Sequence, residues 1–557
     1  MGFTRRSGHK NRPECSFAAA QPAWKEIYMS TISDIKEGKT SLGIELGSTR
    51  VKAVLIGSDH TPIASGDCVW ENRKVDGWWT YTMEDVWNSI QKAYAAMAQD
   101  VQSRYEITLE SVGSIGISGM MHGYIPFDKD GGQLCIFRTW RNTRTAEASK
   151  LLTDMLQFNI PQRWSSSHLT QAILNGEEHV KDIAFLTTIA GYVHWKLTGE
   201  KAIGIGEASG MFPVANGTYD RNMIKIYDAW LKEQGMPYTL EEILPPVKAA
   251  GEKDGQLTEA GAVLLDPTGM LKAGIPFCPP EGDAGTGMAA TNSVRVKTGN
   301  ISAGTSIFSM IVLEKPLAHV YSEVDMVTTP DGMPVAMIHC NTCSSDIDSW
   351  VNLFSDLLDT AGAHRDKAEL YPMLYKAALE GDPACDGLMA FNCYAGEPVI
   401  GTSAGTPVFM RRPDVKVSLA SFMRTHLYSA IATLCAGNDL LLCNEHVEVD
   451  QIYGHGGFFK TKGVGQKLMA DALNVPVTVM ETAGEGGPWG MALLAAYMRE
   501  KEEGEALSDW LDEKVFRDAQ AETILPNASG HEGFEKYKKQ YLKCVEAEKK
   551  AAETMLG

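Results

Sequence analysis

The sequence predicts a duplicated α/β fold, because one strand–turn–strand pattern occurs twice in a chain of 557 residues. In the first copy, two short apolar runs flank Gly47-Ser48-Thr49, which is typical of a β-hairpin. In the second copy, similar runs flank Gly304-Thr305-Ser306, about half the chain further along. Small residues let backbone N–H groups approach a phosphate closely. The two copies therefore predict two α/β halves with a phosphate clamp between them.

A third small-residue turn lies late in the second half. A strand is expected over Val449–Tyr453, and it is followed by Gly454-His455-Gly456-Gly457. A helix over residues 466–473 and a strand over residues 475–479 come next. Glycines between a strand and a helix are where an α/β fold admits a nucleotide. Taken alone, this turn is equally compatible with a tight turn that binds nothing.

The composition excludes several classes of protein. Hydrophobic residues make up 44% of the chain and charged residues 22%, which is typical of a globular protein. The 51 basic and 70 acidic residues give a net charge of −19, which argues against nucleic acid or an anionic membrane surface as partner. No apolar run reaches the roughly 18 residues of a membrane-spanning helix. A small polyanion such as ATP stays compatible with this charge, because a few backbone amides and one Mg²⁺ ion bind it locally.

The cysteines and the first residues bear on the compartment. The 11 cysteines include only one close pair, Cys340 and Cys343, and no second pair completes a zinc site. Free thiols in a reducing cytoplasm are therefore expected. Residues 1–40 contain no signal peptide, and they are expected to be a loose or artefactual leader. The charged segment from Glu532 to Lys550 predicts a helix that is compatible with a homodimer, although a solvated helix is the simpler interpretation.

Asp283 is the catalytic candidate. It lies among small residues in Gly282-Asp283-Ala284-Gly285, about twenty residues before the second hairpin. An aspartate at the start of a helix is also an ordinary N-cap. Next to a phosphate site, however, its carboxylate is suited to orient an attacking hydroxyl and to accept its proton.

With these motifs in this order, the chain from about Leu42 to about Tyr497 resembles the FGGY carbohydrate kinase family. The resemblance implies the duplicated actin-like ATPase (ribonuclease H-like) fold, with two domains around a central cleft and a hinge at residues 290–300. A sugar-binding domain is expected over 41–295, an ATP-binding domain over 296–500 and a helical segment over 501–557. ATP and Mg²⁺ are the implied cofactors, and Asp283 the implied base. The nucleotide-binding residues implied are Gly47, Ser48, Thr49, Lys52, Gly304, Thr305, Ser306, Gly456 and Gly457.

Within the family, the sugar half is similar to the xylulokinase subgroup. Met121-His122 resembles the pair that lines the ketose pocket there, and the segment from Trp140 to Arg144 resembles a second sugar-binding stretch. The sugar-binding residues implied are Met121, His122, Trp140, Asn142, Arg144 and Asp283. Imidazole and indole groups suit this task, because they hydrogen-bond to and stack on sugars.

Three positions depart from the family pattern. Glu45 stands where the family has the aspartate that helps hold Mg²⁺, so Glu45 and Asp283 are the expected metal-binding acids. Asn142 stands where the subgroup has an aspartate, which removes a carboxylate expected to contact the sugar, and Arg141 adds a positive charge beside it. Glu207 replaces a further aspartate. These departures affect the sugar's identity more than the reaction class.

The resemblance implies an ATP-dependent kinase that converts a short ketose to its phosphate. D-xylulose, giving D-xylulose 5-phosphate, is the first candidate, and L-ribulose, L-xylulose or another ketose or polyol are alternatives. Two further classes stay open: an actin-like ATPase that does not act on sugars, and a weakened sugar sensor.

Overall fold

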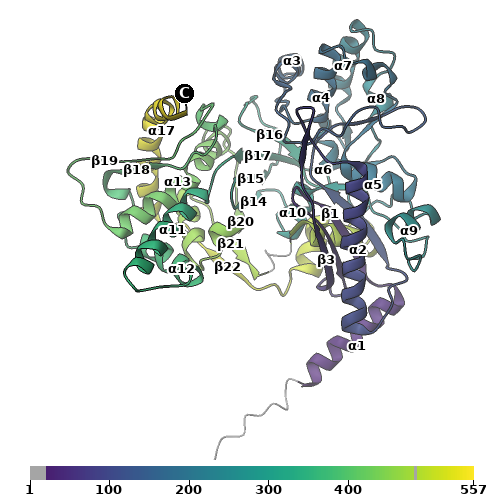
Figure 1. The fold of residues 1–557 in the computed structure, drawn as a ribbon, viewed down its shortest axis with the longest axis horizontal. Coiled ribbons are helices and arrows are strands. Elements are labelled where there is room, and N and C mark those ends of the chain that lie inside the picture. The colour runs from purple at the N-terminus through teal and green to yellow at the C-terminus, as the bar shows by residue number, and fades with distance from the viewer. Residues whose placement is uncertain (1–20, 482–485, 557) are drawn as a thin grey trace, which may run out of the picture.

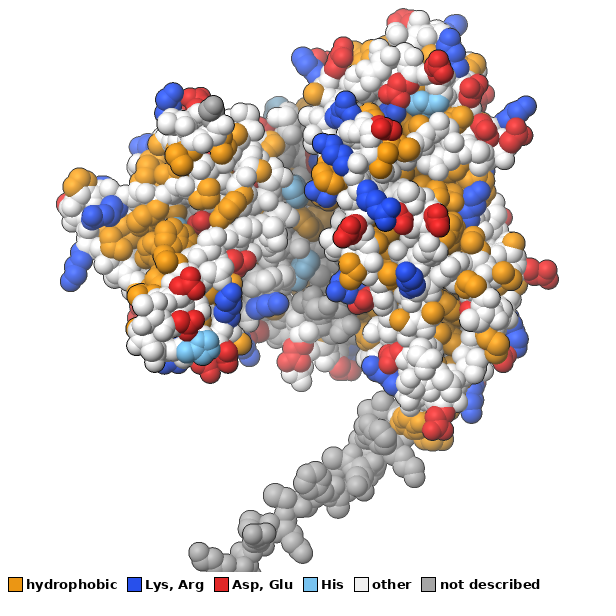
Figure 2. All heavy atoms as spheres, in the orientation of Figure 1, with side chains coloured by type: hydrophobic (Ala, Val, Ile, Leu, Met, Phe, Trp, Pro, Cys, Tyr) orange, Lys and Arg blue, Asp and Glu red, His pale blue; other side chains and the backbone are white. Residues whose placement is uncertain are grey.

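Each half of the chain is built around one mixed β-sheet, and the two sheets follow the same strand scheme. The computed structural model describes residues 21–481 and 486–556. Figure 1 shows the sheets in two α/β domains that stand side by side, and Figure 2 shows a hollow between the domains on the face drawn. The predicted duplicated α/β architecture is confirmed.

The N-terminal sheet contains, in spatial order, β13 (Glu281–Gly282), β6 (Ser114–Gly119), β1 (Ser41–Leu46), β2 (Arg50–Ile56) and β3 (Pro62–Val69). The strands β1, β2 and β3 are antiparallel neighbours, which confirms the first predicted hairpin. The pairs β1–β6 and β6–β13 are parallel. Every residue of β6 is buried, as is usual for a central parallel strand.

The C-terminal sheet contains, in spatial order, β16 (Asp325–Thr328), β17 (Pro334–Cys340), β15 (Ile307–Val312), β14 (Thr298–Ala303), β20 (Gln451–His455), β21 (Val477–Met480) and β22 (Ala521–Ile524). The antiparallel pair β14–β15 is the second predicted hairpin. The parallel neighbours β20 and β21 stand where β6 and β13 stand in the first sheet. The expected strand, helix and strand around the third turn are confirmed, with the first strand two residues later than expected.

The helices of the N-terminal half flank its sheet (Figure 1). The long helix α2 packs on β3, and Gly66 permits the close approach, since an added Cβ would lie 2.3 Å from the Ala93 carbonyl oxygen. These helices are α1 (Gln21–Glu37), α2 (Met83–Tyr105), α3 (Ala146–Leu156), α4 (Ser165–Leu174), α5 (Ile189–Thr198), α6 (Ile205–Ala208), α7 (Arg221–Glu233), α8 (Leu240–Ile243), α9 (Glu259–Leu265) and α10 (Asp283–Ala290).

The helices of the C-terminal half are α11 (Ser345–Thr360), α12 (Lys367–Ala378), α13 (Leu419–Asp439), α14 (Val464–Leu473), α15 (Gly486–Glu500), α16 (Leu507–Trp510) and α17 (Ala528–Leu556). One apolar face of α17, which includes Phe534, Tyr537 and Tyr541, is buried against its own domain. The predicted tail helix therefore has an intramolecular packing role, and its contribution to a homodimer stays a prediction. Within the described residues, no helix combines the length and apolar character that a membrane span needs.

The helix α15 belongs to the N-terminal domain, although it follows the C-terminal sheet in sequence. It packs against β1, β6 and α10. Two glycines allow this contact: a Cβ on Gly43 would lie 2.1 Å from the Pro488 carbonyl oxygen, and one on Gly490 would lie 1.9 Å from that of Thr286. The structure thus differs from the expected division at residue 500, because α15 lies in the first domain and the following segment adds β22 to the second.

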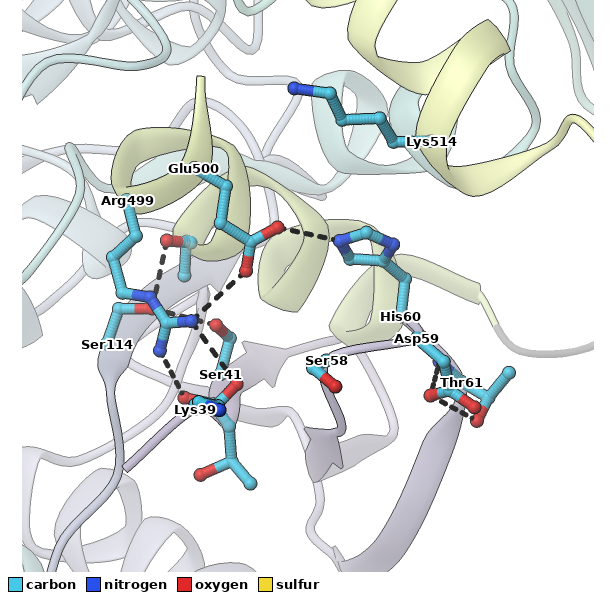
Figure 3. A network of polar contacts seen from close by, with 12 residues as sticks. Lys39, Ser41, Ser58, Asp59, His60, Thr61, Ser114, Arg499, Glu500 and Lys514 are labelled. Atoms are coloured by element: carbon cyan, nitrogen blue, oxygen red, sulfur yellow. Dashed lines mark hydrogen bonds and ion pairs between the residues drawn. The ribbon is translucent and has the colours of Figure 1, made fainter. Parts of the chain in front are cut away.

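The end of α15 fastens the segment before β1 (Figure 3). The Arg499 guanidinium donates hydrogen bonds to the carbonyls of residues 38–40, and Glu500 Oε2 lies 2.8 Å from His60 Nε2. Nearby, Asp34 accepts hydrogen bonds from the backbone and hydroxyl of Ser58. Residues 21–40 therefore differ from the expected loose leader, since they form α1 and a bonded connection. The expectation for residues 1–20 lies outside the described residues.

The chain crosses between the domains at the expected hinge, between α10 and β14. Asn292 and Lys297 in this crossing have φ angles of 54° and 64°, which produce sharp local turns. Between them, Arg295 pairs with Asp509 at 2.7 Å and with Asp512 at 2.6 Å. The crossing is thus tied to the segment that returns from α16 to the second sheet.

Candidate active site

The first glycine turn, between β1 and β2, is held by two aromatic side chains. Trp70 Nε1 donates to the Gly47 carbonyl at 2.7 Å, and the Tyr81 hydroxyl donates to the Ser48 carbonyl at 2.6 Å. The two rings stack with centroids 4.1 Å apart. Among the described residues, the backbone N–H groups of Ser48 and Thr49 have no acceptor. The turn therefore has fixed carbonyls and N–H groups that can donate to an anion.

The second glycine turn, between β14 and β15, is held in a similar way. The Cys343 N–H donates to the Thr305 carbonyl at 2.8 Å, and the Ser344 hydroxyl donates to the Gly304 carbonyl at 2.7 Å. A Cβ added to Gly304 would meet no atom within 4 Å. The space beside this turn is thus open to a ligand.

The third glycine turn contacts the second one directly. Gly456 has a φ of 98°, and a Cβ there would lie 2.4 Å from the Ala303 carbonyl oxygen. Only glycine tolerates both this conformation and this contact. Gly457, by contrast, faces open space. The structure thus brings together the two turns of the C-terminal domain that were predicted to bind nucleotide.

Asp283 is the first residue of α10 and faces the segment that follows β6. Its Oδ1 accepts a hydrogen bond from the Met121 N–H at 3.2 Å. Burial raises the pKa of Asp283 to about 6, although backbone N–H donors, including those of Met121 and Ala284, oppose the shift. The N-cap of α10 is Gly282, so the alternative interpretation of Asp283 as an N-cap is wrong. A carboxylate with this pKa can accept a proton near neutral pH.

Glu45 lies on β1 directly opposite Lys52 on β2. Burial raises its pKa to about 7, with Lys52 lowering and Asp283 raising the pKa further. Its Oε2 is buried and has no hydrogen-bond partner among the described residues. An orphaned carboxylate oxygen beside a second acid fits a magnesium–nucleotide complex that is reached through water. In the part of the chain that the structure describes, no three His, Cys, Asp or Glu side chains form a direct metal site.

Two further buried acids lie behind Asp283. Glu281 accepts hydrogen bonds from the N–H groups of Gly282 at 2.8 Å and Gly206 at 3.3 Å, and burial raises its pKa to about 7. Glu207 is fully buried, and burial raises its pKa well above the usual range, with the Glu281 and Asp283 charges adding to the shift. The sequence reasoning missed Glu281, although its place two residues before Asp283 was a usable signal.

On the sugar side, His122 is held in one orientation by two neighbours. Its Nδ1 lies 3.1 Å from the Gly210 carbonyl, and its ring stacks on Trp164 with centroids 6.2 Å apart. Burial lowers the pKa of His122 to about 3, and the Arg163 guanidinium lowers it further. The ring is thus neutral, and a carbonyl partner assigns the proton to Nδ1. Nε2 is left as an acceptor for a sugar hydroxyl.

In the segment from Trp140 to Arg144, one side chain contacts the first glycine turn and two lie over tryptophan rings. Trp140 Nε1 donates to the Ser48 hydroxyl at 3.1 Å, so this side chain borders the first glycine turn. The Arg144 guanidinium lies over the Trp78 ring at 4.9 Å, and that of Arg141 lies over the Trp79 ring at 4.1 Å. Neither guanidinium forms an ion pair within the described residues. Both arginines thus keep their donors for solvent or ligand.

Asn142 has a structural role that the sequence did not indicate. Its Oδ1 accepts from the Trp79 N–H at 2.8 Å, and its Nδ2 donates to the carbonyls of Trp79 and Thr139, both at 2.9 Å. The side chain is buried. Both donors of the amide are therefore used by the backbone, which corrects the view of Asn142 as a simple replacement for a sugar-binding carboxylate.

The two domains approach each other beside these groups. A small cavity lies between the end of α10 and the third glycine turn, and it is lined by Ala290, Thr291, Tyr453, Gly454 and Met480. Figure 2 shows histidine side chains among the groups within the hollow. The cavity thus lies where the end of α10, the helix that begins at Asp283, meets the start of the third glycine turn.

Comparison with known proteins agrees with this geometry. The model of the N-terminal domain of the FGGY family of carbohydrate kinases matches residues 40–288, and the model of the C-terminal domain matches residues 299–499. A xylulose kinase of Haemophilus influenzae is 21% identical over 526 residues, which cover 90% of this chain and 98% of that protein. A glycerol kinase of Thermococcus gammatolerans is 23% identical over 52% of this chain and 56% of its own length.

Solved structures show the same fold. The ligand-bound xylulose kinase of Lactobacillus acidophilus has a TM-score of 0.72 and 16% identity, covering 91% of this chain and 97% of its own. The gluconate kinase of Lactobacillus acidophilus has a TM-score of 0.74 and 16% identity, covering 92% and 99%. Since the two family models together match most of the chain, it belongs to the FGGY family of carbohydrate kinases and is a sugar kinase.

Proposed function

We propose that this kinase transfers the γ-phosphate of ATP to a terminal hydroxyl of a short ketose. The observation that carries the proposal is the bond between the Met121 N–H and Asp283 Oδ1. It holds the candidate base against the segment that resembles a ketose pocket. The ATP phosphates are assigned to the two hairpin turns and the adenosine to the turn at Gly456 and Gly457.

The reaction follows from the roles of the groups. The sugar hydroxyl oxygen attacks the γ-phosphorus, the bond from this phosphorus to the β–γ bridging oxygen breaks, and ADP leaves with that electron pair. Asp283 orients the hydroxyl and accepts its proton. Free N–H groups at Ser48 and Thr49, together with Lys52, stabilise the negative charge. Glu45 and Asp283 would hold Mg²⁺ through water, and the ion would neutralise phosphate charge.

Domain closure protects the transfer from water. Water competes with the sugar hydroxyl for the γ-phosphate. When the catalytic groups of the two domains meet only around both bound substrates, transfer to the sugar is favoured over hydrolysis of ATP. Because ATP is the donor, the expected compartment is the cytoplasm.

The sugar's identity rests on resemblance. The xylulose kinase relative makes D-xylulose the first candidate, and L-ribulose and L-xylulose are the alternatives. Because other similar proteins are a glycerol kinase and a gluconate kinase, glycerol and gluconate should also be tested as phosphate acceptors. Arg141 and Arg144 form no ion pair among the described residues, so their charges would favour a sugar with electronegative groups beside Trp78 and Trp79.

A coupled ADP assay over ketoses, aldoses, polyols and gluconate tests the proposal. We expect ADP production that depends on a ketose, with kcat/KM highest for a five-carbon ketose. ADP production that ignores every sugar would instead indicate an actin-like ATPase. A sugar that raises the melting temperature without any ADP production would indicate a sensor.

A further inference from the structure

The strand β16 of the C-terminal domain contacts both supports of His122. It is the edge strand of its sheet, on the side that faces the N-terminal domain (Figure 1). An edge strand carries unpaired backbone groups that must find partners elsewhere. In this chain the Thr328 N–H and the side chains of Asp325 and Thr328 have partners in the sugar-binding half.

The first end of β16 is bound to the loop that precedes α4. The Asp325 carboxylate forms an ion pair with the Arg163 guanidinium. Asn159 Nδ2 donates to the Val324 carbonyl at 2.9 Å and to Asp325 Oδ1 at 3.1 Å. The residue after Arg163 is Trp164, the ring on which His122 stacks. This end of β16 is thus one residue away from the stacking partner of His122.

The other end of β16 is bound to α6 and to the residue that follows it. The Thr328 N–H donates to the Ser209 hydroxyl at 3.1 Å, and the Thr328 hydroxyl donates to the Ile205 carbonyl at 3.1 Å. The residue after Ser209 is Gly210, whose carbonyl fixes His122 Nδ1. Both groups that orient the His122 ring are therefore attached, through one neighbour each, to a single four-residue strand of the other domain.

The Arg163 charge acts on one histidine of each domain. Burial lowers the pKa of His122 to about 3 and that of His339 on β17 to about 4, and in both cases the Arg163 charge contributes. The ion pair of Arg163 with Asp325 is only partly exposed, so the pair is less screened than a surface pair.

We propose that β16 couples the nucleotide domain to the sugar site, and that Arg163, Asp325 and Ser209 are positioning residues that act on His122 through Trp164 and Gly210. A rotation of the C-terminal domain displaces β16 and with it both supports of the ring. Nucleotide binding and sugar binding then influence each other equally, as thermodynamic linkage requires. The inference rests on the proposed function for the role of His122, but its first test needs no sugar.

The first test measures hydrogen exchange of the full chain with and without the magnesium complex of β,γ-imido-ATP. In the natural protein, we expect exchange in residues 157–166 and 205–212 to change at least threefold on nucleotide binding. Asp325→Asn should reduce this change below 1.5-fold, while the nucleotide Kd stays within twofold. The reversed pair, Arg163→Asp with Asp325→Arg, should restore part of the change even if a single variant is unstable.

The control is Arg104→Gln, which removes an ion pair with Asp100 inside α2, far from β16; it should behave as the natural protein does. An unchanged response in Asp325→Asn, or no response in the natural protein, overturns the coupling. Failure of the nucleotide to bind at all overturns the proposed function instead, and the coupling with it.

The second test uses the sugar that the ADP assay identifies. Asp325→Asn leaves every residue of the N-terminal domain in place, so the sugar Kd without nucleotide should stay within twofold. The sugar KM at saturating ATP should rise about 5–20-fold, with a smaller change in kcat. An equal rise of Kd and KM would show a purely structural effect and contradict the proposal.

Discussion

The backbone N–H of Met121 donates to Asp283 Oδ1 across 162 residues of sequence. The bond joins the end of β6 to the start of α10, which follows the neighbouring strand β13. Parallel strands that end at one edge of a sheet bring their following residues together. The sugar segment and the candidate base are therefore neighbours because of sheet topology, and the following expectations depend on that arrangement.

Asp283→Asn should nearly abolish turnover. The amide keeps the shape of the side chain but cannot accept the hydroxyl proton, so kcat should fall about 10²–10⁴-fold. Calorimetry should show nucleotide affinity within a few-fold of the natural value. Turnover near the natural rate would remove Asp283 from the role of base.

The activity should depend on pH through the same group. Burial raises the pKa of Asp283 to about 6, and only its deprotonated form accepts a proton. A profile of kcat/KM should therefore fall below about pH 6 and level off above it. A flat profile between pH 5 and 8, with intact protein throughout, would contradict this expectation.

Asp283→Asn should also stabilise the fold at neutral pH. A carboxyl whose pKa is raised from 3.8 in the unfolded chain to about 6 in the fold destabilises the folded state increasingly as the pH rises through that window. The uncharged amide avoids this cost, which amounts to about 2–3 kcal/mol above pH 6. Denaturant unfolding at pH 7.5 should show the gain, and unfolding at pH 4 should not. Equal stability at both pH values would mean that burial does not perturb this carboxyl.

Gly457→Val and Gly456→Val should have opposite consequences. A Cβ at Gly457 meets no atom, so the valine should leave the melting temperature nearly unchanged and lower nucleotide affinity at least tenfold by occupying ligand space. At Gly456 the Cβ would clash with the Ala303 carbonyl oxygen at a φ of 98°, so stability should fall. Calorimetry and thermal unfolding separate the two. Unchanged ATP binding in Gly457→Val would count against the nucleotide role of this turn.

Asn142→Asp is expected to destabilise the sugar side. The carboxylate cannot donate to the carbonyls of Trp79 and Thr139 and would face both of them, a cost of about 2–4 kcal/mol. Thermal unfolding should show the loss, and Asn216→Asp in an exposed turn is the matched control. A variant that keeps its stability and gains kcat/KM for D-xylulose would instead support the original interpretation of this position as a sugar contact.

His122→Ala should weaken sugar binding without affecting the nucleotide. The lost hydrogen bond to a sugar hydroxyl is worth about 1–3 kcal/mol, or roughly a 5–150-fold rise in sugar KM. His364→Ala, at an exposed position, controls for the loss of an imidazole. A sugar KM within twofold of the natural value would show that His122 only supports the fold.

The fold could be predicted from the sequence where the signal was local. The glycine turns with their flanking apolar runs gave both hairpins, and the order of the motifs gave the family. The position of α15 could not be predicted, because the reason for it is the fit of Gly43 and Gly490 against backbone that is distant in sequence. The role of Asn142 was hidden for the same reason, since an amide that bonds to a neighbouring strand looks identical in sequence to one that faces a ligand.

The insertion of α15 into the first domain affects the order in which the protein can mature. A ribosome that has released residues up to 290 has made every strand of the N-terminal sheet, but not the helix that covers β1 and β6. Val54, Ile56, Met288 and Ala289, which share an apolar cluster with the side chains of α15, then await about two hundred further residues. This chain therefore cannot follow the usual order of folding, in which the first domain folds as soon as it leaves the ribosome. The first domain is thus completed only after most of the second has been made, and nascent chains that stop before residue 486 lack the helix that covers this face.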